Sequence, residues 1–243
     1  ETLEADLFRG QAPKEDRQRV FGGHVIGQAL VAAARTSEGR RPHSLHAYFL
    51  RPGDPKVPII YDVDCIRDGR SFTTRNVVAR QHGRPIYNMS VSLMVDEKGL
   101  EHQISMPDVP DPDDLPEERE RRAALLHRIP EKSQARFMAD RAIEIRPIDP
   151  RDPVEPDPAP PIERYWARTR QPLPDDFDRH ECVLAYASDI TLLATCLVPH
   201  GTTWYGGKIL SASLDHSMWF HRPFRADEWL LFDQTSPSSS GGR

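Results

Sequence analysis

Apolar positions first recur at helical spacing in the stretch VFGGHVIGQALVAAART, where alanine and leucine dominate. Two glycines open this stretch, and the positions that follow at intervals of three and four residues are Val25, Gln28, Ala29 and Ala32. This spacing, together with the glycines before it, predicts a helix that the chain enters through glycine.

The next region changes to a strand-like pattern. Residues 44–95 are rich in β-branched and aromatic side chains, and the dipeptides Asp68-Gly69 and His82-Gly83 interrupt them. Because such dipeptides are turn signals, the region predicts four strands in an antiparallel meander.

Two stretches rich in proline and aspartate follow the predicted strands. Residues 106–116, MPDVPDPDDLP, read as a linker, since proline interrupts the hydrogen bonding of a central strand. A short charged helix is predicted from Pro116 to about Arg128, and residues 146–161 read as a second extended connector.

A second helical pattern then appears in the run VLAYASDITLLATCLV. One helical face would carry Ile190, Leu193, Ala194 and Leu197. Ser188 or Asp189 is in position to start this helix, because both residue types favour the N-cap.

These patterns form an internal repeat. A shift of 171 residues lays Tyr48, Phe49, Arg51 and Pro52 over Trp219, Phe220, Arg222 and Pro223, and a shift of 165 lays His24 over Asp189. The expected fold is therefore of the α+β class, with two tandem helix-plus-antiparallel-sheet repeats at residues 1–105 and 141–243, joined by a linker with a short helix at 106–140.

The last two strands of the first copy start near Ser71. Their equivalents would start at 242, so the repeat predicts roughly 25 further residues beyond Arg243 that complete the second copy.

Composition narrows the functional classes. The net charge is −5 without a long run of like charge, so no nucleic-acid footprint is visible. No apolar run approaches the length of a membrane span, and the N-terminal residues lack a signal-peptide core, which predicts a soluble, intracellular, cytoplasmic protein. Three cysteines without CxxC spacing are expected to be reduced core residues, and they imply neither a metal site nor a disulfide.

Seven motifs resemble one known family. They are LFRGQ, VFGGHVIGQAL, HSLHAYFLRPGD, PIIYDV, RDGRSF, YASD and LDHSMWFHRPF, and the likeness extends from Leu7 to Trp229. In this order they are similar to acyl-CoA thioesterase II. The resemblance implies a double hot-dog fold and hydrolysis of fatty acyl-CoA to free fatty acid and CoA. We expect no cofactor, fatty acyl-CoA as the binding partner, and a homo-oligomer.

The resemblance also implies a catalytic set of an aspartate, a threonine or serine, and a glutamine. Asp189 of YASD matches the aspartate and Ser213 matches the hydroxyl residue, whereas the glutamine matches no position up to Arg243 and is expected on a strand beyond it. Asp189 would orient or deprotonate the water that attacks the thioester. Gly22, Gly23 and His24 are candidate substrate-binding residues, because a helix N-terminus offers N–H donors and glycine allows close approach.

Structural interpretations stand beside these assignments. Asp189 before an apolar helix is often only an N-cap, and a strand serine such as Ser213 is rarely functional by itself. Four histidines alternate with apolar residues and are expected to be structural, with His43 as the reserve base: His43, His46, His216 and His221. The segment SLDHSMWFHRPF is expected to be mostly core strand, with Met218, Trp219 and Phe220 spaced for packing.

Two other functions remain open at this stage. A hot-dog enoyl-CoA hydratase would carry an aspartate and a histidine about five residues apart on the helix, but Ala194 occupies that position here. A non-catalytic acyl-CoA binding protein would be consistent with the unmatched glutamine.

Overall fold

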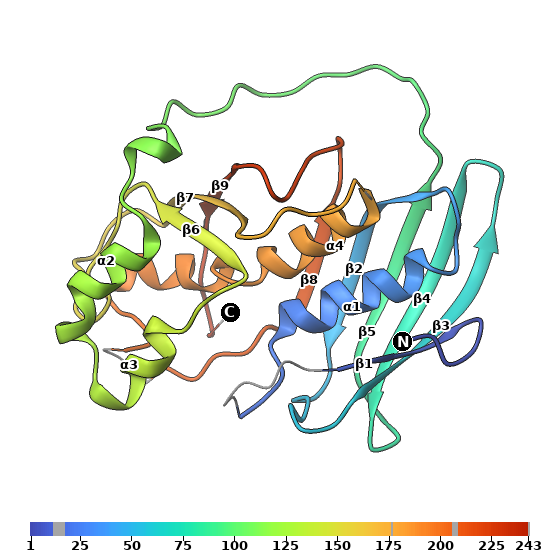
Figure 1. Ribbon diagram of the computed structural model, residues 1–243, viewed down its shortest axis with the longest axis horizontal. Coiled ribbons are helices and arrows are strands. Elements are labelled where there is room, and N and C mark those ends of the chain that lie inside the picture. Colours follow the sequence, from blue (N-terminus) through green and yellow to red (C-terminus); the bar gives the residue numbers. More distant parts are fainter. Residues whose placement is uncertain (12–17, 176, 206–208, 243) are drawn as a thin grey trace. The chain divides into compact units, whose positions relative to one another are not determined.

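The computed structural model describes residues 1–11, 18–175, 177–205 and 209–242 (Figure 1). The chain divides into two compact units that interleave along the sequence. The first unit consists of residues 1–101, 174–190 and 212–225, and the second of residues 102–173, 191–211 and 226–243. The repeat boundaries near 105 and 140 are boundaries along the sequence, and they stay a prediction.

The first unit is built on a six-stranded antiparallel sheet. Its strand order is β1 (Leu7–Gly10), β3 (Ile59–Asp68), β4 (Phe72–Gln81), β5 (Arg84–Met94), β2 (Arg41–Phe49) and β8 (Asp215–Trp219). The four strands predicted between residues 44 and 95 are confirmed. Only β3, β4 and β5 form a meander, because β2 pairs with the far side of β5 rather than with β3.

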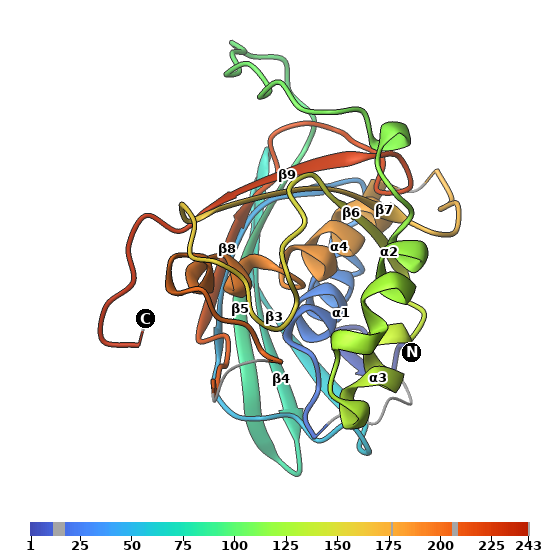
Figure 2. The same ribbon diagram turned by 90° about the vertical axis from the view of Figure 1, so that its left-hand side faces the viewer.

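Helix α1 (Gly22–Ala34) lies against one face of this sheet, beside helix α4 (Phe177–Ser188) (Figure 2). The apolar face of α1 is fully buried, and Ile26, Ala29, Leu30 and Ala33 have no exposed surface. The predicted helix is therefore confirmed, and its apolar stripe forms the core with the inward side chains of the strands.

Two glycines of α1 allow its close contact with α4. A Cβ atom at Gly23 would lie 2.3 Å from the carbonyl oxygen of Tyr186, and one at Gly27 would lie 3.1 Å from the carbonyl oxygen of Cys182. Because Gly23 and Gly27 are four residues apart, they lie on the same helix face. These glycines thus let two helix backbones approach each other.

The second helix lies closer to the N-terminus than its apolar pattern predicts. The α-helix α4 ends at Ser188, and the following residues form a turn and then the 3₁₀ helix η3 (Leu192–His200), whose Leu192 and Leu193 are exposed. The prediction that a helix begins at Ser188 or Asp189 is therefore wrong. The helix lies upstream because Cys182 and Ala185 are buried against α1.

The pairing of β2 with β8 bears out the repeat. His46 lies opposite Ser217, and these residues are 171 positions apart, which equals the repeat shift. Equivalent strands of the two copies therefore meet antiparallel around this pair, and the remaining pairs bring together residues that are not equivalent.

Side chains of β8 alternate between the two faces of the sheet. His216 and Phe220 are buried, whereas Trp219 is 55% exposed and meets the ring of His46 edge-on. The expectation that Trp219 packs in the core is wrong, because a strand buries every second residue.

The second unit contains the sheet β6 (Ile143–Pro147), β7 (Ile162–Thr169) and β9 (Leu230–Thr235), in that order. The short charged helix predicted from residue 116 is confirmed as α2 (Glu118–Leu125), continued by the 3₁₀ turn η2 (Leu126–Arg128). The 3₁₀ turn η1 (Pro112–Asp114) precedes it and helix α3 (Glu131–Met138) follows.

One helical run, Arg179–His200, is long and apolar enough to cross a membrane by length and composition alone. The sequence pattern had led us to expect none. This is weak evidence for a span, because the core helix of a soluble protein passes the same test.

Of the three cysteines, which form no disulfide, Cys182 is buried as expected, but Cys65 is exposed on β3.

Candidate active site

The structure brings Asp189 and Ser213 together in the first unit. Asp189 follows the last residue of α4, and Ser213 lies two residues before β8. The Ser213 hydroxyl donates a hydrogen bond of 3.0 Å to Oδ1 of Asp189. The backbone N–H of Gly23 also donates to this carboxylate. Asp189 is thus held by donors from two separate segments of the chain.

Asp189 lies at the N-terminus of α1 rather than at the start of its own helix. Gly23 is the second residue of α1, and its N–H is one of the donors that an α-helix leaves without an internal partner. A carboxylate at this end is stabilised by the helix dipole. Asp189 therefore acts as a cap, as the sequence suggested, but it caps α1 instead of the helix predicted to start at Asp189.

Burial dominates the electrostatics of Asp189. It raises the pKa of the carboxyl above its ordinary value, because a half-buried carboxylate loses hydration. The hydrogen bonds from Ser213 and Gly23 and the nearby His216 favour the charged form, but they only partly offset the desolvation. The raised pKa brings Asp189 closer to the range in which a carboxylate acts as a general base.

The three residues proposed to bind substrate lie in different environments. A Cβ atom at Gly22 would lie 2.6 Å from Oδ2 of Asp189, so glycine leaves that oxygen uncrowded. Gly23 contacts the carboxylate through its backbone. The His24 ring instead lies 2.8 Å from the carbonyl oxygen of Gln11 and 2.9 Å from the Gln28 amide. The structure brings the two glycines to Asp189, but it does not bring the His24 ring there.

His216 is a neighbour of Asp189 that sequence reasoning treated as structural. Its ring is buried, and Nε2 lies 3.0 Å from the Ser188 hydroxyl. Burial lowers the pKa of His216, while the charges of Asp189 and Asp215 act in the opposite direction. The sequence signal that could have pointed to His216 as a neighbour of the site is its position three residues after Ser213.

Tyr87, on β5, is the second neighbour that the sequence did not reveal. Its side chain is 1% exposed, and within the described part of the chain its hydroxyl has no hydrogen-bond partner. Burial raises the pKa of the Tyr87 phenol, and the charge of Asp189 adds to this shift. A tyrosine in an apolar strand carries no sequence signal that separates it from ordinary core residues.

The reserve base, His43, has other partners. Its Nε2 lies 2.7 Å from the Ser92 hydroxyl, its ring meets Phe72 edge-on, and burial lowers its pKa. No group of three metal-binding side chains occurs among residues 1–11, 18–175, 177–205 and 209–242.

Comparison with known proteins identifies the family. Residues 132–243 match the family model described as acyl-CoA thioesterase, and residues 12–94 match its N-terminal domain. Acyl-coenzyme A thioesterase 8 of Homo sapiens is 40% identical over 259 residues, covering all of this chain and 78% of that protein. This chain belongs to the acyl-CoA thioesterase II family.

Further members of the family are consistent with this assignment. Acyl-CoA thioesterase 2 of Haemophilus influenzae is 38% identical and is covered over 85% of its length. The crystal structure of acyl-CoA thioesterase II TesB2 from Mycobacterium marinum has a TM-score of 0.78 and 44% identity, with coverage of 100% of this chain and 85% of that one. The predicted double hot-dog fold is confirmed, and the protein is a thioester hydrolase.

Proposed function

We propose that this thioesterase hydrolyses fatty acyl-CoA to a free fatty acid and CoA at a site centred on Asp189. The observation that carries the proposal is the 3.0 Å hydrogen bond from Ser213 to a carboxylate whose pKa is raised by burial. The printed names of the relatives, acyl-CoA thioesterases, support the substrate class. Release of free thiol from palmitoyl-CoA tests it. A folded, pure sample without turnover of palmitoyl-CoA would contradict fatty acyl-CoA as the substrate.

In the proposed reaction, Asp189 accepts a proton from a water molecule as the water oxygen attacks the thioester carbon. The carbon–sulfur bond then breaks, and CoA leaves as a thiolate, which is stable enough to depart without a strong acid. The proton on Asp189 passes to the thiolate or to solvent, and this restores the carboxylate for the next turnover. The Ser213 hydroxyl holds the water and the carboxylate in line. The glutamine implied by the family resemblance, which matches no residue up to Arg243, would hold the other side of the water.

The carbonyl oxygen of the thioester needs hydrogen-bond donors as negative charge develops on it. We place it at the N-terminus of α1, where Gly22 leaves space beside Oδ2 of Asp189. The Gly23 N–H is directed to Asp189, so in this proposal it orients the base. Because the N–H groups of His24 and Val25 donate to the Phe21 carbonyl, the Gly22 N–H and the helix dipole would then stabilise the oxyanion.

Replacing Ser213 by alanine is expected to lower kcat roughly tenfold, because a hydrogen bond to a charged group contributes about 1.5–3 kcal/mol. Ser213→Thr, which keeps the hydroxyl, should retain most of the activity. Thermal unfolding of both variants controls for folding. Unchanged turnover by a stable Ser213→Ala protein would make Ser213 an ordinary strand-end residue.

The pH dependence of kcat/KM should report the environment of Asp189. Only the ionised carboxylate can accept a proton, so activity is lost as pH falls through the pKa of this group. Because that pKa is raised, the acidic limb should lie at higher pH than for an exposed aspartate. The Ser213→Ala variant should move the limb to still higher pH, since the Ser213 hydrogen bond lowers the pKa. An identical limb in both proteins would contradict the proposed coupling.

A further inference from the structure

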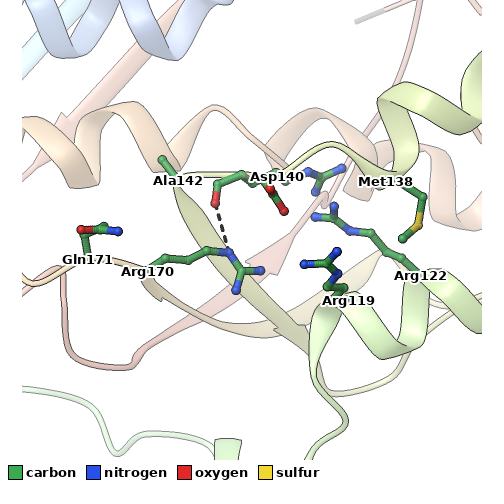
Figure 3. Close-up of a pocket in the computed structure, with 8 residues that line it drawn as sticks. Arg119, Arg122, Met138, Asp140, Ala142, Arg170 and Gln171 are labelled. Carbon is green, nitrogen blue, oxygen red and sulfur yellow. Dashed lines mark hydrogen bonds between the residues drawn. The ribbon is translucent and has the colours of Figure 1, made fainter.

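The second unit contains an arginine-lined pocket of about 510 Å³. Its arginines come from three places in the chain: Arg119 and Arg122 from α2, Arg141 from the segment before β6, and Arg170 from the end of β7. Figure 3 shows that the guanidinium groups of Arg119, Arg122 and Arg170 converge on a common space. Four cationic side chains therefore line one cavity.

A buried glutamate holds three of these arginines in place. Glu118 is 1% exposed and accepts hydrogen bonds from Arg122, from Arg170 at 3.0 Å and from Arg141 at 3.4 Å. Backbone carbonyls fix the same groups further. Arg122 donates to the carbonyl of Ala139 at 3.0 Å, and Nε of Arg170 donates to the carbonyl of Arg141 at 3.1 Å. The cationic groups are thus positioned before any ligand binds.

Positive charge in the pocket exceeds the negative charge that balances it. Three guanidinium groups share the single carboxylate of Glu118, and Asp140 is the one acidic side chain among the residues that line the pocket. Burial and the neighbouring charge of Arg122 both lower the pKa of Arg141, so the arrangement is unfavourable for the cations themselves. An anion bound among them would relieve this repulsion.

We propose that this pocket binds a phosphate group. Guanidinium forks match the geometry of phosphate oxygens, and a dianion suits several converging arginines better than a monoanionic carboxylate. The cavity volume exceeds that of a bare phosphate and lies in the range of small-molecule sites, so a larger phosphorylated ligand also fits. The phosphate therefore comes either from inorganic phosphate or from coenzyme A. The second source rests on the proposed function.

Isothermal titration of the whole protein with inorganic phosphate, against chloride at matched ionic strength, tests the site. Arg119→Gln is the informative variant, because Arg119 forms no ion pair within the described part of the chain and its loss leaves the Glu118 cluster intact. We expect phosphate affinity to fall about tenfold, as for one charge-assisted hydrogen bond. Arg136→Gln is the matched control, since Arg136 is exposed on the neighbouring helix α3 and does not line the pocket.

Competition distinguishes the two sources. Coenzyme A that displaces phosphate, together with a raised KM for acyl-CoA in Arg119→Gln, would identify the phosphates of the substrate. Dephospho-coenzyme A, which lacks the 3′-phosphate, then shows which phosphate is bound. Phosphate that binds but is not displaced by coenzyme A would identify inorganic phosphate as the ligand.

Two results overturn the phosphate site: no phosphate binding at matched ionic strength, or equal affinity in Arg119→Gln and the wild type. Both are binding measurements without turnover, so they are separate from failure of the proposed hydrolysis. The melting temperature of Arg119→Gln, compared with that of Arg136→Gln, detects any loss of folding.

Discussion

Replacing Asp189 by asparagine is expected to lower thioesterase turnover at least a hundredfold, as for removal of a positioned general base. Asparagine keeps the size of the side chain, and its amide oxygen can still accept the hydrogen bond from Ser213. It cannot take a proton from water. Turnover of palmitoyl-CoA by the purified variant measures this effect.

The same substitution should not lower the stability of the fold at neutral pH. The pKa of Asp189 is raised in the folded protein, so folding favours the protonated carboxyl. This favourable contribution is fully present below the pKa of the unfolded chain, and it is lost as pH rises through the folded pKa. At pH 7 the ionised carboxylate therefore costs stability, and a neutral asparagine should leave the melting temperature equal or higher.

Asp215→Asn provides the control for charge. Asp215 is exposed at the start of β8 and acts electrostatically on the same histidine, His216. Its removal should leave turnover near the wild-type value. Wild-type turnover by a folded Asp189→Asn protein would refute the proposed base, and equal losses in the two variants would reduce the effect to general electrostatics.

The parts of the fold that were predictable have local causes. Helix α1 follows from its apolar stripe, and β3, β4 and β5 follow from strand patterns interrupted by the turn dipeptides Asp68-Gly69 and His82-Gly83. The 171-residue repeat shift was also visible in the sequence, but that the equivalent strands β2 and β8 pair with each other emerged only from the structure. Local propensity and tertiary packing agree in these elements.

Helix α4 was missed because its boundaries depend on packing. The apolar run that continues through residues 190–198 carries a stronger periodic signal than the charged segment at residues 177–182. The α-helix nevertheless forms upstream, where Ala185 is fully buried and Gly27 of α1 allows close approach. Such a contact between residues far apart in the chain leaves no mark in either local pattern.

The candidate site was predictable only in part for the same reason. Asp189 and Ser213 were paired by family resemblance, and their hydrogen bond depends on where α4 ends and β8 begins. His24 was assigned to the substrate because it follows two glycines. In the structure its ring instead contacts the amide of Gln28, one helical turn later. Gly22 leaves room for the Asp189 carboxylate, and Gly23 donates to it through its backbone N–H and also allows α1 to pack closely against α4.

Replacing Gly23 by alanine is therefore expected to destabilise the protein strongly. The new Cβ atom would lie 2.3 Å from the backbone carbonyl oxygen of Tyr186, and a backbone atom cannot rotate away as a side chain can. Overpacking of this kind lowers the free energy of unfolding by about 1–3 kcal/mol. The helix-forming advantage of alanine over glycine, up to about 1 kcal/mol, offsets only part of this loss.

Because the clash is with a backbone atom, we expect the upper end of this range, a net loss of about 2 kcal/mol, which corresponds to a decrease in melting temperature of roughly 4–8 °C for a chain of this length. Gly27→Ala should destabilise the protein less, because its nearest backbone atom would lie 3.1 Å from the new Cβ. Gly99→Ala should leave the melting temperature unchanged, since no atom lies within 4 Å.

Because the Gly23 N–H donates to Asp189, separation of α1 from α4 should also raise the pKa of that carboxyl. The acidic limb of the activity profile would then move to higher pH in Gly23→Ala alone. If Gly23→Ala unfolds at the same temperature as Gly99→Ala, then α1 and α4 are not in contact at this glycine, and Gly23 does not hold the base in place.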